Sequence, residues 1–287
     1  MNVSQDTYAE KRKGNKKRFF ILLLILLIPI FFTGFFVGKS FSAPKKPIEP
    51  EVIEDVEAPL VQEEQKPKEE EQSKEETSAV EKPTGKVVYL TFDDGPSKLT
   101  DEFLNVLQEH DVKATFFMQG KNLKKEYLQE SVKRAVKERH YIGAHSMTHD
   151  FKKLYKENQF VPEMRETLEL IRDITGESPQ LVRPPYGSAP GLKNEQIRQQ
   201  LVDAEIKVWD WTIDSQDWKL KDNPNQIIEN IKLGTKDEKE IVLMHEKTQT
   251  LAALPEVIKF YKEQGYQFAI YDESDHFVLN FLNDIRL

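Results

Sequence analysis

The sequence predicts an α/β protein, a deformed β/α barrel of about seven parallel strands. Short apolar runs rich in β-branched and aromatic residues recur from Lys86 onward, and amphipathic stretches of helical length lie between most of them. This alternation is typical of parallel strands joined by helical crossovers. Polar residues that can carry chemistry directly follow several of the runs. In a parallel sheet these positions meet at the carboxyl ends of the strands, where function gathers. An open doubly wound sheet is the alternative architecture.

The predicted strands are short and rich in large apolar side chains. They occupy residues 87–92, 113–118, 141–144, 180–183, 206–211, 240–245 and 266–271. The predicted helices have apolar residues at helical spacing, and examples are Asp101–His110, Leu123–Arg139, Pro162–Thr175 and Pro255–Gln264. The chain contains no internal repeat and no glycine-rich phosphate loop.

The N-terminal region predicts a membrane anchor. Residues 1–18 are polar and carry six Lys/Arg against two acids, and Phe19–Gly38 follows without a charge. An apolar helix of roughly 20 residues spans about 30 Å, one hydrocarbon core, and a preceding basic cluster stays in the cytoplasm. We therefore expect a cytoplasmic tail at 1–18, a single transmembrane helix at 19–38, and everything beyond it outside the cell. Cleavage as a signal peptide near Ser40-Phe41-Ser42 would instead give a secreted protein.

Residues 39–84 predict a disordered linker. They are rich in Pro, Glu, Lys and Gln, and they carry seven Lys against thirteen acids with few large apolar side chains. Such a composition cannot bury enough apolar surface to offset the entropy of folding. A solvated charged helix around Glu63–Glu76 is the alternative. The remaining residues, 85–287, are enough for one sizeable core.

Charge and cysteine content exclude several classes of function. The chain has a net charge of −8 and no cysteine, which excludes disulfides and thiolate chemistry. Residues 85–287 carry a charge of about −6 once the basic tail and the acidic linker are set aside. They show no basic face of the size that nucleic acid requires. We therefore expect no nucleic-acid partner.

Two adjacent carboxylates end the first predicted strand. The apolar run Val87–Phe92 leads into Asp93 and Asp94, and Gly95-Pro96 then stops regular structure. Because successive side chains of a strand point to opposite faces, the two carboxylates should diverge and should not share one proton. One can bind a metal while the other works beside it as a base. Taken alone, the pair also fits an ordinary strand-to-turn junction.

Two histidines follow the third predicted strand. If the turn after that strand is helical, His145 and His149 lie four residues apart on one face and can chelate one divalent ion. Asp94 would complete a set of two histidines and one carboxylate with coordination positions left open. A histidine pair at this spacing is usually incidental, but its place directly after a strand favours the metal. Three others are interpreted as surface or helix-end residues: His110, His140 and His276.

A rigid loop follows the fourth predicted strand. Arg183 ends the strand, and Pro184 and Pro185 restrict the backbone that follows. A planar guanidinium that is always charged is suited to holding a carboxylate. Tyr186, unlike the two prolines, keeps a backbone N–H that can donate to an oxyanion. A structural Pro-Pro turn with a surface arginine is the alternative interpretation.

Two further polar clusters lie at the ends of later strands. Trp209–Trp218 combines three tryptophans with several aspartates. Indole faces stack on sugar rings and the acids can bind hydroxyls, although the tryptophans equally suit a core. The buried run Ile241–Met244 ends in His245. A histidine in this position can act as a general acid if a carboxylate orients it.

Together these stretches resemble the polysaccharide deacetylase family, carbohydrate esterase family four, with its NodB homology domain. The resemblance covers about residues 85–272 and agrees in order and spacing with five family motifs: Thr91–Pro96, His145–His149, Arg183–Gly187, Asp214–Trp218 and Leu243–His245. One departure is Glu246, where the family commonly has Asp. We expect this difference to affect substrate contacts more than activity.

The resemblance implies a metal site with a base beside it. Asp94, His145 and His149 would hold a divalent ion, with zinc expected first and cobalt or manganese as alternatives. Asp93 would be the base that activates the attacking water, and Arg183 would orient it.

The resemblance also implies an acid and substrate contacts. His245 would protonate the departing amine, and Asp217 would orient His245, with Asp214 the weaker candidate for that task. The backbone N–H of Tyr186 would stabilise the oxyanion, and Trp218 would contact the sugar.

The implied function is metal-dependent removal of acetyl groups from N-acetylated sugars by a NodB-like catalytic domain at residues 85–287. The anchor and linker favour peptidoglycan, and specifically its N-acetylglucosamine residues, because a tethered enzyme meets only the nearby wall. Chitin or poly-N-acetylglucosamine is the alternative substrate. A catalytically silent glycan-binding module is the alternative of another class. An Asp-nucleophile phosphotransferase would leave the histidine pair unexplained. We expect a membrane-bound monomer.

Overall fold

The computed structural model describes residues 85–287. The predicted tail at 1–18, anchor at 19–38 and linker at 39–84 lie outside the described residues. Among the helices of 85–287, none has the length and apolar character needed to cross a bilayer. The comparison with prediction therefore concerns the folded domain.

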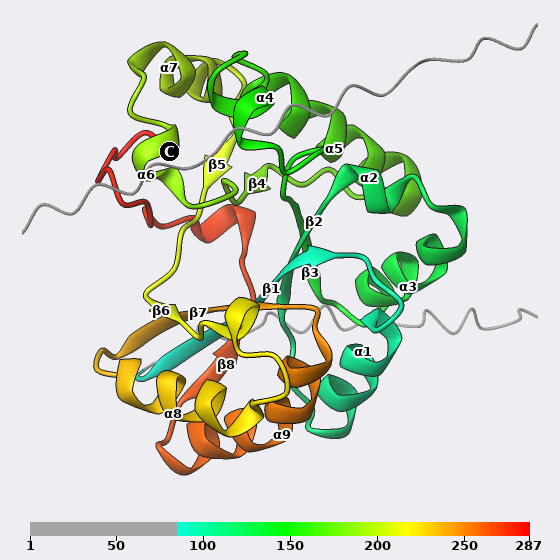
Figure 1. Cartoon of the computed structure of the whole chain (residues 1–287), viewed down its shortest axis with the longest axis vertical. Helices are drawn as coiled ribbons and strands as arrows, with labels where there is room; N and C mark the ends of the chain where they lie inside the picture. Colours follow the sequence, from blue (N-terminus) through cyan, green and yellow to red (C-terminus); the bar gives the residue numbers. More distant parts are fainter. Residues whose placement is uncertain (1–84) are drawn as a thin grey trace, which may run out of the picture. The chain divides into compact units, whose positions relative to one another are not determined.

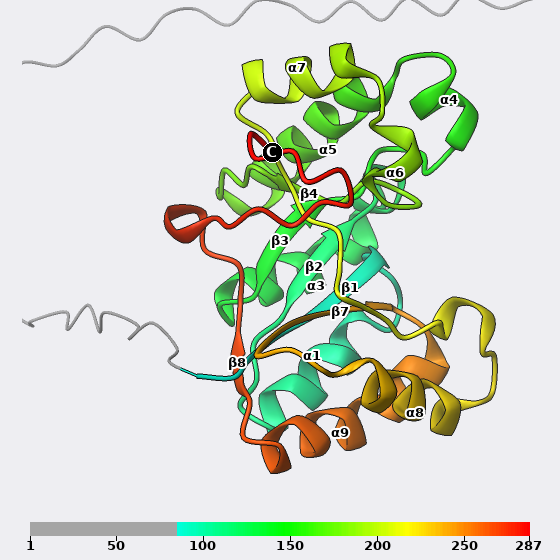
Figure 2. The ribbon, with the colours of Figure 1, turned by 90° about the vertical axis from the view of Figure 1, so that its left-hand side faces the viewer.

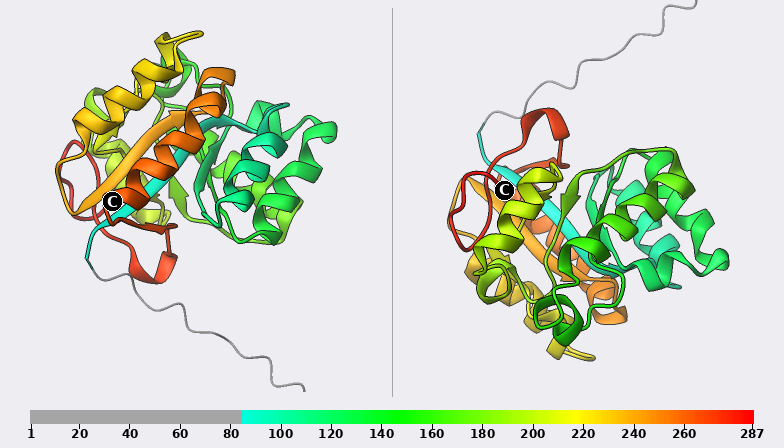
Figure 3. Two further views of the ribbon diagram at one scale, coloured as in Figure 1. Left: turned by 90° about the horizontal axis from the view of Figure 1, so that it is seen from below. Right: turned by 90° about the horizontal axis from the view of Figure 1, so that it is seen from above.

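Every strand within residues 85–287 belongs to one parallel sheet (Figure 1). The strands are β1 Val87–Gly95, β2 Thr115–Met118, β3 Tyr141–Ala144, β4 Leu181–Val182, β5 Lys207–Val208, β6 Ile213–Asp214, β7 Lys239–His245 and β8 Gln267–Ala269. Their order in space is β5-β4-β3-β2-β1-β7-β6, with β8 paired to β1 beside this path. The sheet curls, but β5 and β6 are the two ends of the path, so the result is an open half-barrel (Figure 3). The predicted parallel α/β architecture is confirmed.

Helices surround the outside of the curled sheet (Figures 1 and 3). The α-helices are α1 Thr100–Glu109, α2 Gly120–Leu123, α3 Glu126–Lys137, α4 Phe151–Tyr155, α5 Phe160–Thr175, α6 Ser188–Gly191, α7 Glu195–Asp203, α8 Pro224–Gly234 and α9 Thr248–Glu263. Two short 3-10 helices are η1 Asp217–Lys219 and η2 Glu273–Asp275.

Some boundaries differ from the predicted ones. The helix predicted at Leu123–Arg139 is divided into α2 and α3, because Lys125 between them has an extended backbone. The helix predicted from Pro255 begins at Thr248 and contains the proline, whose missing N–H removes a single helical hydrogen bond. Strand β6, Ile213–Asp214, was not predicted. It is a strand because it pairs with β7, and two residues carry no periodic signal of their own.

Strand β1 separates two hydrophobic clusters. Its outward residues pack under the helices in the main cluster: Val88, Leu90 and Phe92. Val87 and Tyr89 belong to a second cluster on the inner side of the sheet. Because strand side chains alternate, Thr91 and Asp93 continue that inner row. The inner face of β1 therefore changes from apolar to polar toward its carboxyl end.

The C-terminal segment covers the open side of the half-barrel (red in Figure 2). Trp209, between β5 and β6, forms an isolated parallel bridge with Leu279. Its indole Nε1 donates to the carbonyl of Phe277 at 3.0 Å, and the next amide, that of Asp210, donates to the carbonyl of Leu279 at 2.7 Å. The segment thus satisfies backbone groups that an open sheet would leave unpaired.

Candidate active site

The two carboxylates that end β1 occupy different environments. Asp93 is 2% exposed on the inner face of the sheet, whereas the side chain of Asp94 is 33% exposed. Asp94 has a left-handed φ of 71°, and the register of β1 against β2 shifts between Asp93 and Gly95. This irregularity turns the carboxylate of Asp94 away from the regular alternation of side chains along β1. The two carboxylates differ in exposure but do not diverge as predicted, because both approach Nε2 of His145, at 3.6 Å from Asp93 and 3.8 Å from Asp94.

Arg183 holds Asp93, as predicted. Both side chains are buried, and Nη1 donates to Oδ1 of Asp93 at 2.9 Å and to Oγ1 of Thr91 at 2.6 Å. The guanidinium also donates to the backbone carbonyls of Trp209 at 3.2 Å and Asp210 at 2.8 Å. A charge-assisted contact of this kind fixes the direction of the carboxylate. Asp93 is therefore held in one orientation at the end of β1.

Asp94, His145 and His149 converge into one cluster. Their ligand atoms all lie within 4.8 Å of one another. Oδ1 of Asp94 is 3.8 Å from Nε2 of each histidine. Nδ1 of His145 lies 2.7 Å from the carbonyl of Arg183. Because a carbonyl only accepts, this Nδ1 carries the proton, and the lone pair of Nε2 faces the cluster.

This donor set fits a divalent metal ion. Two imidazole nitrogens and one carboxylate oxygen leave coordination positions open for water and substrate. Burial lowers the pKa of His149 to about 4. Its imidazole is therefore neutral at physiological pH, the form that binds a metal.

The turn that carries the two histidines is a loop, and the helical turn considered from their spacing is wrong. Residues 145–150 contain no helix, and Ser146 and His149 have left-handed φ values of 63° and 58°. Oγ of Ser146 accepts from the amide of His149 at 2.9 Å, and Glu163 accepts from the amide of Thr148 at 2.9 Å. Hydrogen bonds from side chains to the backbone, and not helical periodicity, bring the imidazoles together.

Gln119 is a contact of the metal cluster that the sequence reasoning missed. It follows β2, is 4% exposed, and donates through Nε2 to Oδ1 of Asp94. Asn122 donates to the backbone carbonyl of Asp94 at 2.9 Å. The signal was available, because a polar residue directly after a buried strand is what marks the other site residues.

His245 ends β7 and is paired with Asp217. Its Nδ1 lies 2.7 Å from Oδ1 of Asp217, whose Oδ2 accepts from the amide of His245 at 2.6 Å and from Oγ1 of Thr250 at 2.5 Å. Burial disfavours the imidazolium, but the hydrogen bond and charge of Asp217 outweigh it and raise the pKa of His245. Asp214 instead accepts from the amide of Gln216 at 2.8 Å, so Asp217 is the partner of His245.

The register of β1 against β7 sets Asp93 opposite His245. The two strands are hydrogen-bonded neighbours at the centre of the sheet. A carboxylate held by an arginine and a histidine held by a carboxylate therefore lie side by side at one edge. This arrangement can take a proton at one group and give a proton at the other.

Tyr186 extends the site beside His149. It has a left-handed φ of 69°, and its hydroxyl donates to the carbonyl of His149 at 3.1 Å. Its amide donates to no backbone carbonyl within residues 85–287 and is free to bind an oxyanion. Behind the loop, the buried carboxylate of Asp210 accepts from the amides of Ser188 at 2.8 Å and Phe281 at 2.7 Å. Asp210 is thus a second contact that the sequence reasoning did not assign.

The tryptophans divide between core and surface. Trp209 is fully buried in the inner cluster. Trp211 is half-buried, with its ring 5.0 Å from that of Phe281. Trp218 is 56% exposed on η1, beside Asp217. Of the three, Trp218 has the exposure that contact with a sugar requires.

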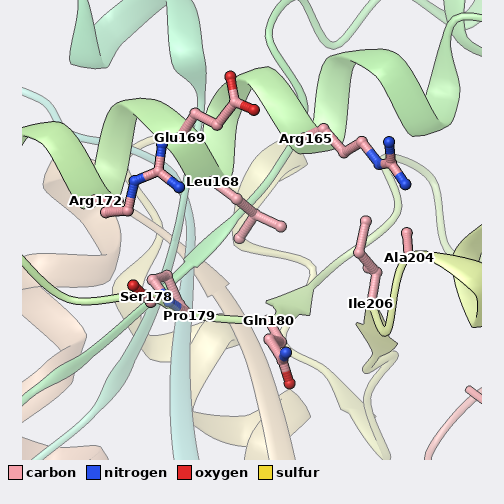
Figure 4. A pocket seen from close by; sticks show the side chains of 9 residues that line it. All are labelled: Arg165, Leu168, Glu169, Arg172, Ser178, Pro179, Gln180, Ala204 and Ile206. Atoms are coloured by element: carbon pink, nitrogen blue, oxygen red, sulfur yellow. The ribbon is translucent and has the colours of Figure 1, made fainter.

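A hollow of about 320 Å³ is separate from this site (Figure 4). Arg165 and Arg172 line it from α5, and Gln180 and Ile206 line it just before β4 and β5. The residues of the active site follow their strands, whereas Gln180 and Ile206 precede β4 and β5. The hollow therefore lies at the opposite edge of the sheet.

Two side chains lie in surroundings that the sequence did not indicate. Glu246 is 8% exposed, and its Oε2 accepts from the hydroxyls of Ser97 and Thr100, each at 2.6 Å, so its carboxylate is bound within the protein. His140 is 4% exposed, and its Nδ1 accepts from the amide of Ala114 at 3.0 Å. Burial lowers the pKa of His140 to about 4, so it is a neutral core residue. Its amide donates to the carbonyl of Ala135 at 2.9 Å, at the end of α3. The helix-end interpretation of His140 is therefore confirmed, and the surface interpretation is wrong.

Comparison with known proteins supports the same chemistry. Residues 80–209 match a family model described as polysaccharide deacetylase. A peptidoglycan-N-acetylglucosamine deacetylase from Bacillus cereus is 50% identical over 208 residues, which cover 70% of this chain and 75% of that protein. This chain belongs to the polysaccharide deacetylase family. It is therefore a hydrolase that acts on carbon–nitrogen bonds.

Other family members differ in the sugar that their names give. The peptidoglycan-N-acetylmuramic acid deacetylase PdaC from Bacillus subtilis is 33% identical over 206 residues, 71% of this chain and 42% of that protein. The crystal structure of the polysaccharide deacetylase Bc1974 from Bacillus cereus has a TM-score of 0.68 and 50% identity, and the match covers 70% of this chain and 100% of that one. The fold of the family is thus the NodB-like half-barrel described above.

Substitution of a metal ligand and substitution of the base should have different effects on metal binding. We expect His145→Ala to lose metal and activity together, because it removes one of three ligands. Asp93→Asn should keep stoichiometric metal and lower kcat by roughly 10²- to 10⁴-fold, the usual contribution of a general base. Metal content by mass spectrometry and initial rates on both variants test this. Loss of metal from Asp93→Asn would contradict the division of roles.

The pairing of His245 with Asp217 predicts a shift in pH dependence. A general acid must be protonated, so activity should fall as pH rises through the raised pKa of His245. Asp217→Asn removes the charge that raises this pKa, so the alkaline limb of kcat/KM should move to lower pH. Asp214→Asn is the matched control and should leave that limb in place. An unchanged alkaline limb in Asp217→Asn would refute the assignment.

Proposed function

We propose that this protein removes the acetyl group from N-acetylglucosamine residues of peptidoglycan in a metal-dependent hydrolysis. One observation carries the proposal. Three groups meet at one edge of the sheet. They are a carboxylate held by an arginine, a histidine held by a carboxylate, and a set of two histidines and one aspartate. Together they offer a base, an acid and a metal site for an acetamide.

The metal site completes the electrophilic side of the reaction. A divalent ion held by Asp94, His145 and His149 would supply a Lewis acid for the acetamide carbonyl. Zinc suits this mixed nitrogen and oxygen donor set, with cobalt and manganese as alternatives.

Asp93 receives the proton of the attacking water. Its ion pair with Arg183 holds the carboxylate in place, and the water gives its proton to it as the new carbon–oxygen bond forms. The amide of Tyr186 donates to the oxygen on which negative charge develops. Because this donor is part of a rigid backbone, it needs no rearrangement during the reaction.

His245 gives its Nε2 proton to the nitrogen as the carbon–nitrogen bond breaks. An amine leaves poorly unless it is protonated, so an acid separate from the base is needed. Asp217 accepts a hydrogen bond from Nδ1 of His245. This contact directs Nε2 away from the protein and stabilises the imidazolium before its proton is transferred. The raised pKa keeps that proton available near neutral pH.

Relatives support peptidoglycan as the substrate. The 50% identical relative is named for peptidoglycan N-acetylglucosamine, while PdaC is named for N-acetylmuramic acid. We propose the former sugar because that relative is more similar over nearly the same length. The exposed ring of Trp218 would stack on the sugar next to His245.

Acetate release tests the function. The zinc-loaded protein should release acetate from peptidoglycan, chelation should stop the release, and added metal should restore it. Mass analysis of muropeptides should place the loss on N-acetylglucosamine and not on N-acetylmuramic acid. N-acetylglucosamine oligomers provide the comparison with chitin-like substrates, and Asp93→Asn is the inactive control. Glycan binding without turnover by the parent protein would instead support a silent binding module.

We also propose that residues 19–38 anchor the chain as a monomer in the cell membrane, with residues 39–84 as a linker and 85–287 as the catalytic domain outside. The uncharged length of 19–38 and the basic cluster before it support this topology. Protease added to intact protoplasts should then remove the catalytic domain and leave a fragment in the membrane fraction. Release of the uncut domain into the medium would indicate a cleaved signal peptide.

A further inference from the structure

Two exposed aromatic rings continue the site beyond the metal cluster. Tyr186 is 54% exposed and Phe151 is 41% exposed. Their ring centroids are 5.7 Å apart, and the ring of Tyr186 lies 4.8 Å from that of His149. Phe151 and Tyr186, here called the aromatic shelf, therefore form a surface that begins at a metal ligand and leads away from it.

The shelf is held in place by the elements behind it. Phe151 begins α4, whose capping residue Asp150 accepts from the amide of Lys153 at 3.0 Å. Leu154 of the same helix is fully buried. The hydroxyl of Tyr155 donates to the carbonyl of Pro185 at 2.8 Å, which ties α4 to the loop that carries Tyr186. A surface fixed in this way loses little conformational entropy when a ligand binds it.

The inward contacts of α4 are made by other residues, which leaves the ring of Phe151 available. Tyr155 stacks on Phe160 with centroids 5.5 Å apart, and its ring also covers Gly191 of α6. Phe151 leans on Tyr155 with centroids 5.2 Å apart. The ammonium of Lys156 lies 5.9 Å from the centroid of Phe151, at the limit of a cation–π contact, and a long side chain of this kind moves easily.

The position of the shelf matches the course of a polysaccharide. The shelf follows β3 and β4, on one side of β1 in the sheet, whereas Trp218 follows β6 on the other side. Figure 2 shows α4 close to α6, the helix that follows the loop of Tyr186, and the ring of Tyr155 in α4 lies against Gly191 of α6. A glycan that ran from the shelf to Trp218 with its acetamide at the central cluster would place a neighbouring sugar on the shelf.

We propose that Phe151, together with Tyr186, forms a subsite for the sugar next to the one that is deacetylated. This inference rests on the proposed function and deepens it, because it makes a glycan strand, and not a single sugar, the preferred substrate. The C–H face of a pyranose is apolar and packs on an aromatic ring. Burial of that face against Phe151 would contribute to binding at a distance from the reacting bond.

The proposal is tested by the dependence of binding on chain length. For the metal-loaded full chain, we expect Phe151→Ala to weaken the Kd of a hexamer of N-acetylglucosamine roughly tenfold. The Kd of N-acetylglucosamine itself, a single sugar that cannot fill the reaction centre and the shelf together, should change by less than about twofold. KM should follow the Kd values, and kcat and metal content should be unchanged. Phe151→Tyr should restore the affinity for the hexamer.

Leu233→Ala is the control, because Leu233 is 71% exposed at the end of α8, before β7. It should leave every Kd at the parental value. Equal losses for the single sugar and the hexamer in Phe151→Ala would show a local distortion of the centre and overturn the subsite. Parental affinity of Phe151→Ala for both ligands would also overturn the subsite. Failure of the proposed function is a different result: the parent protein would then bind the hexamer but release no acetate.

Discussion

The buried ion pair between Arg183 and Asp93 is the contact on which the site depends. Neither side chain is more than 3% exposed, so the loss of hydration of two charges costs several kcal/mol. Hydrogen bonds from the guanidinium to Thr91 and to the carbonyls of Trp209 and Asp210 offset that cost. The pair joins the end of β1 to the loop after β4 and to the link between β5 and β6. Removing one partner would leave a buried charge, typically at a cost of about 3–5 kcal/mol.

The same arginine also organises the metal cluster. Its carbonyl accepts from Nδ1 of His145 and thereby directs Nε2 toward Asp94. Its loop carries Tyr186, whose hydroxyl donates to the carbonyl of His149. The proposed base, two of the proposed metal ligands and the amide proposed for the oxyanion are therefore positioned through one residue and its loop. Groups that are far apart in the chain act as one unit because they share this support.

Parallel strands explain why much of the site could be predicted. Asp93, His145, Arg183 and His245 each end or follow a different strand, and parallel strands bring these positions to one edge. The spacing of the two histidines suggested the right pair for a partly wrong reason, since a hydrogen-bonded loop replaces the helical turn. The contacts of Gln119 with Asp94 and of Asp210 with Ser188 depend on which loops lie opposite each other, which a single sequence does not state.

The amino-acid sequence by itself determined the alternation of strands and helices and the kinds of side chain at the strand ends, because periodicity and turn chemistry are local properties. Only the tertiary structure decided that the half-barrel stays open between β5 and β6 with the C-terminal segment against it. It also decided that Glu246 turns inward to Ser97, and that Ile213–Asp214 is a strand beside β7. Each of these outcomes depends on a partner far away in the chain, and such a partner leaves no local pattern.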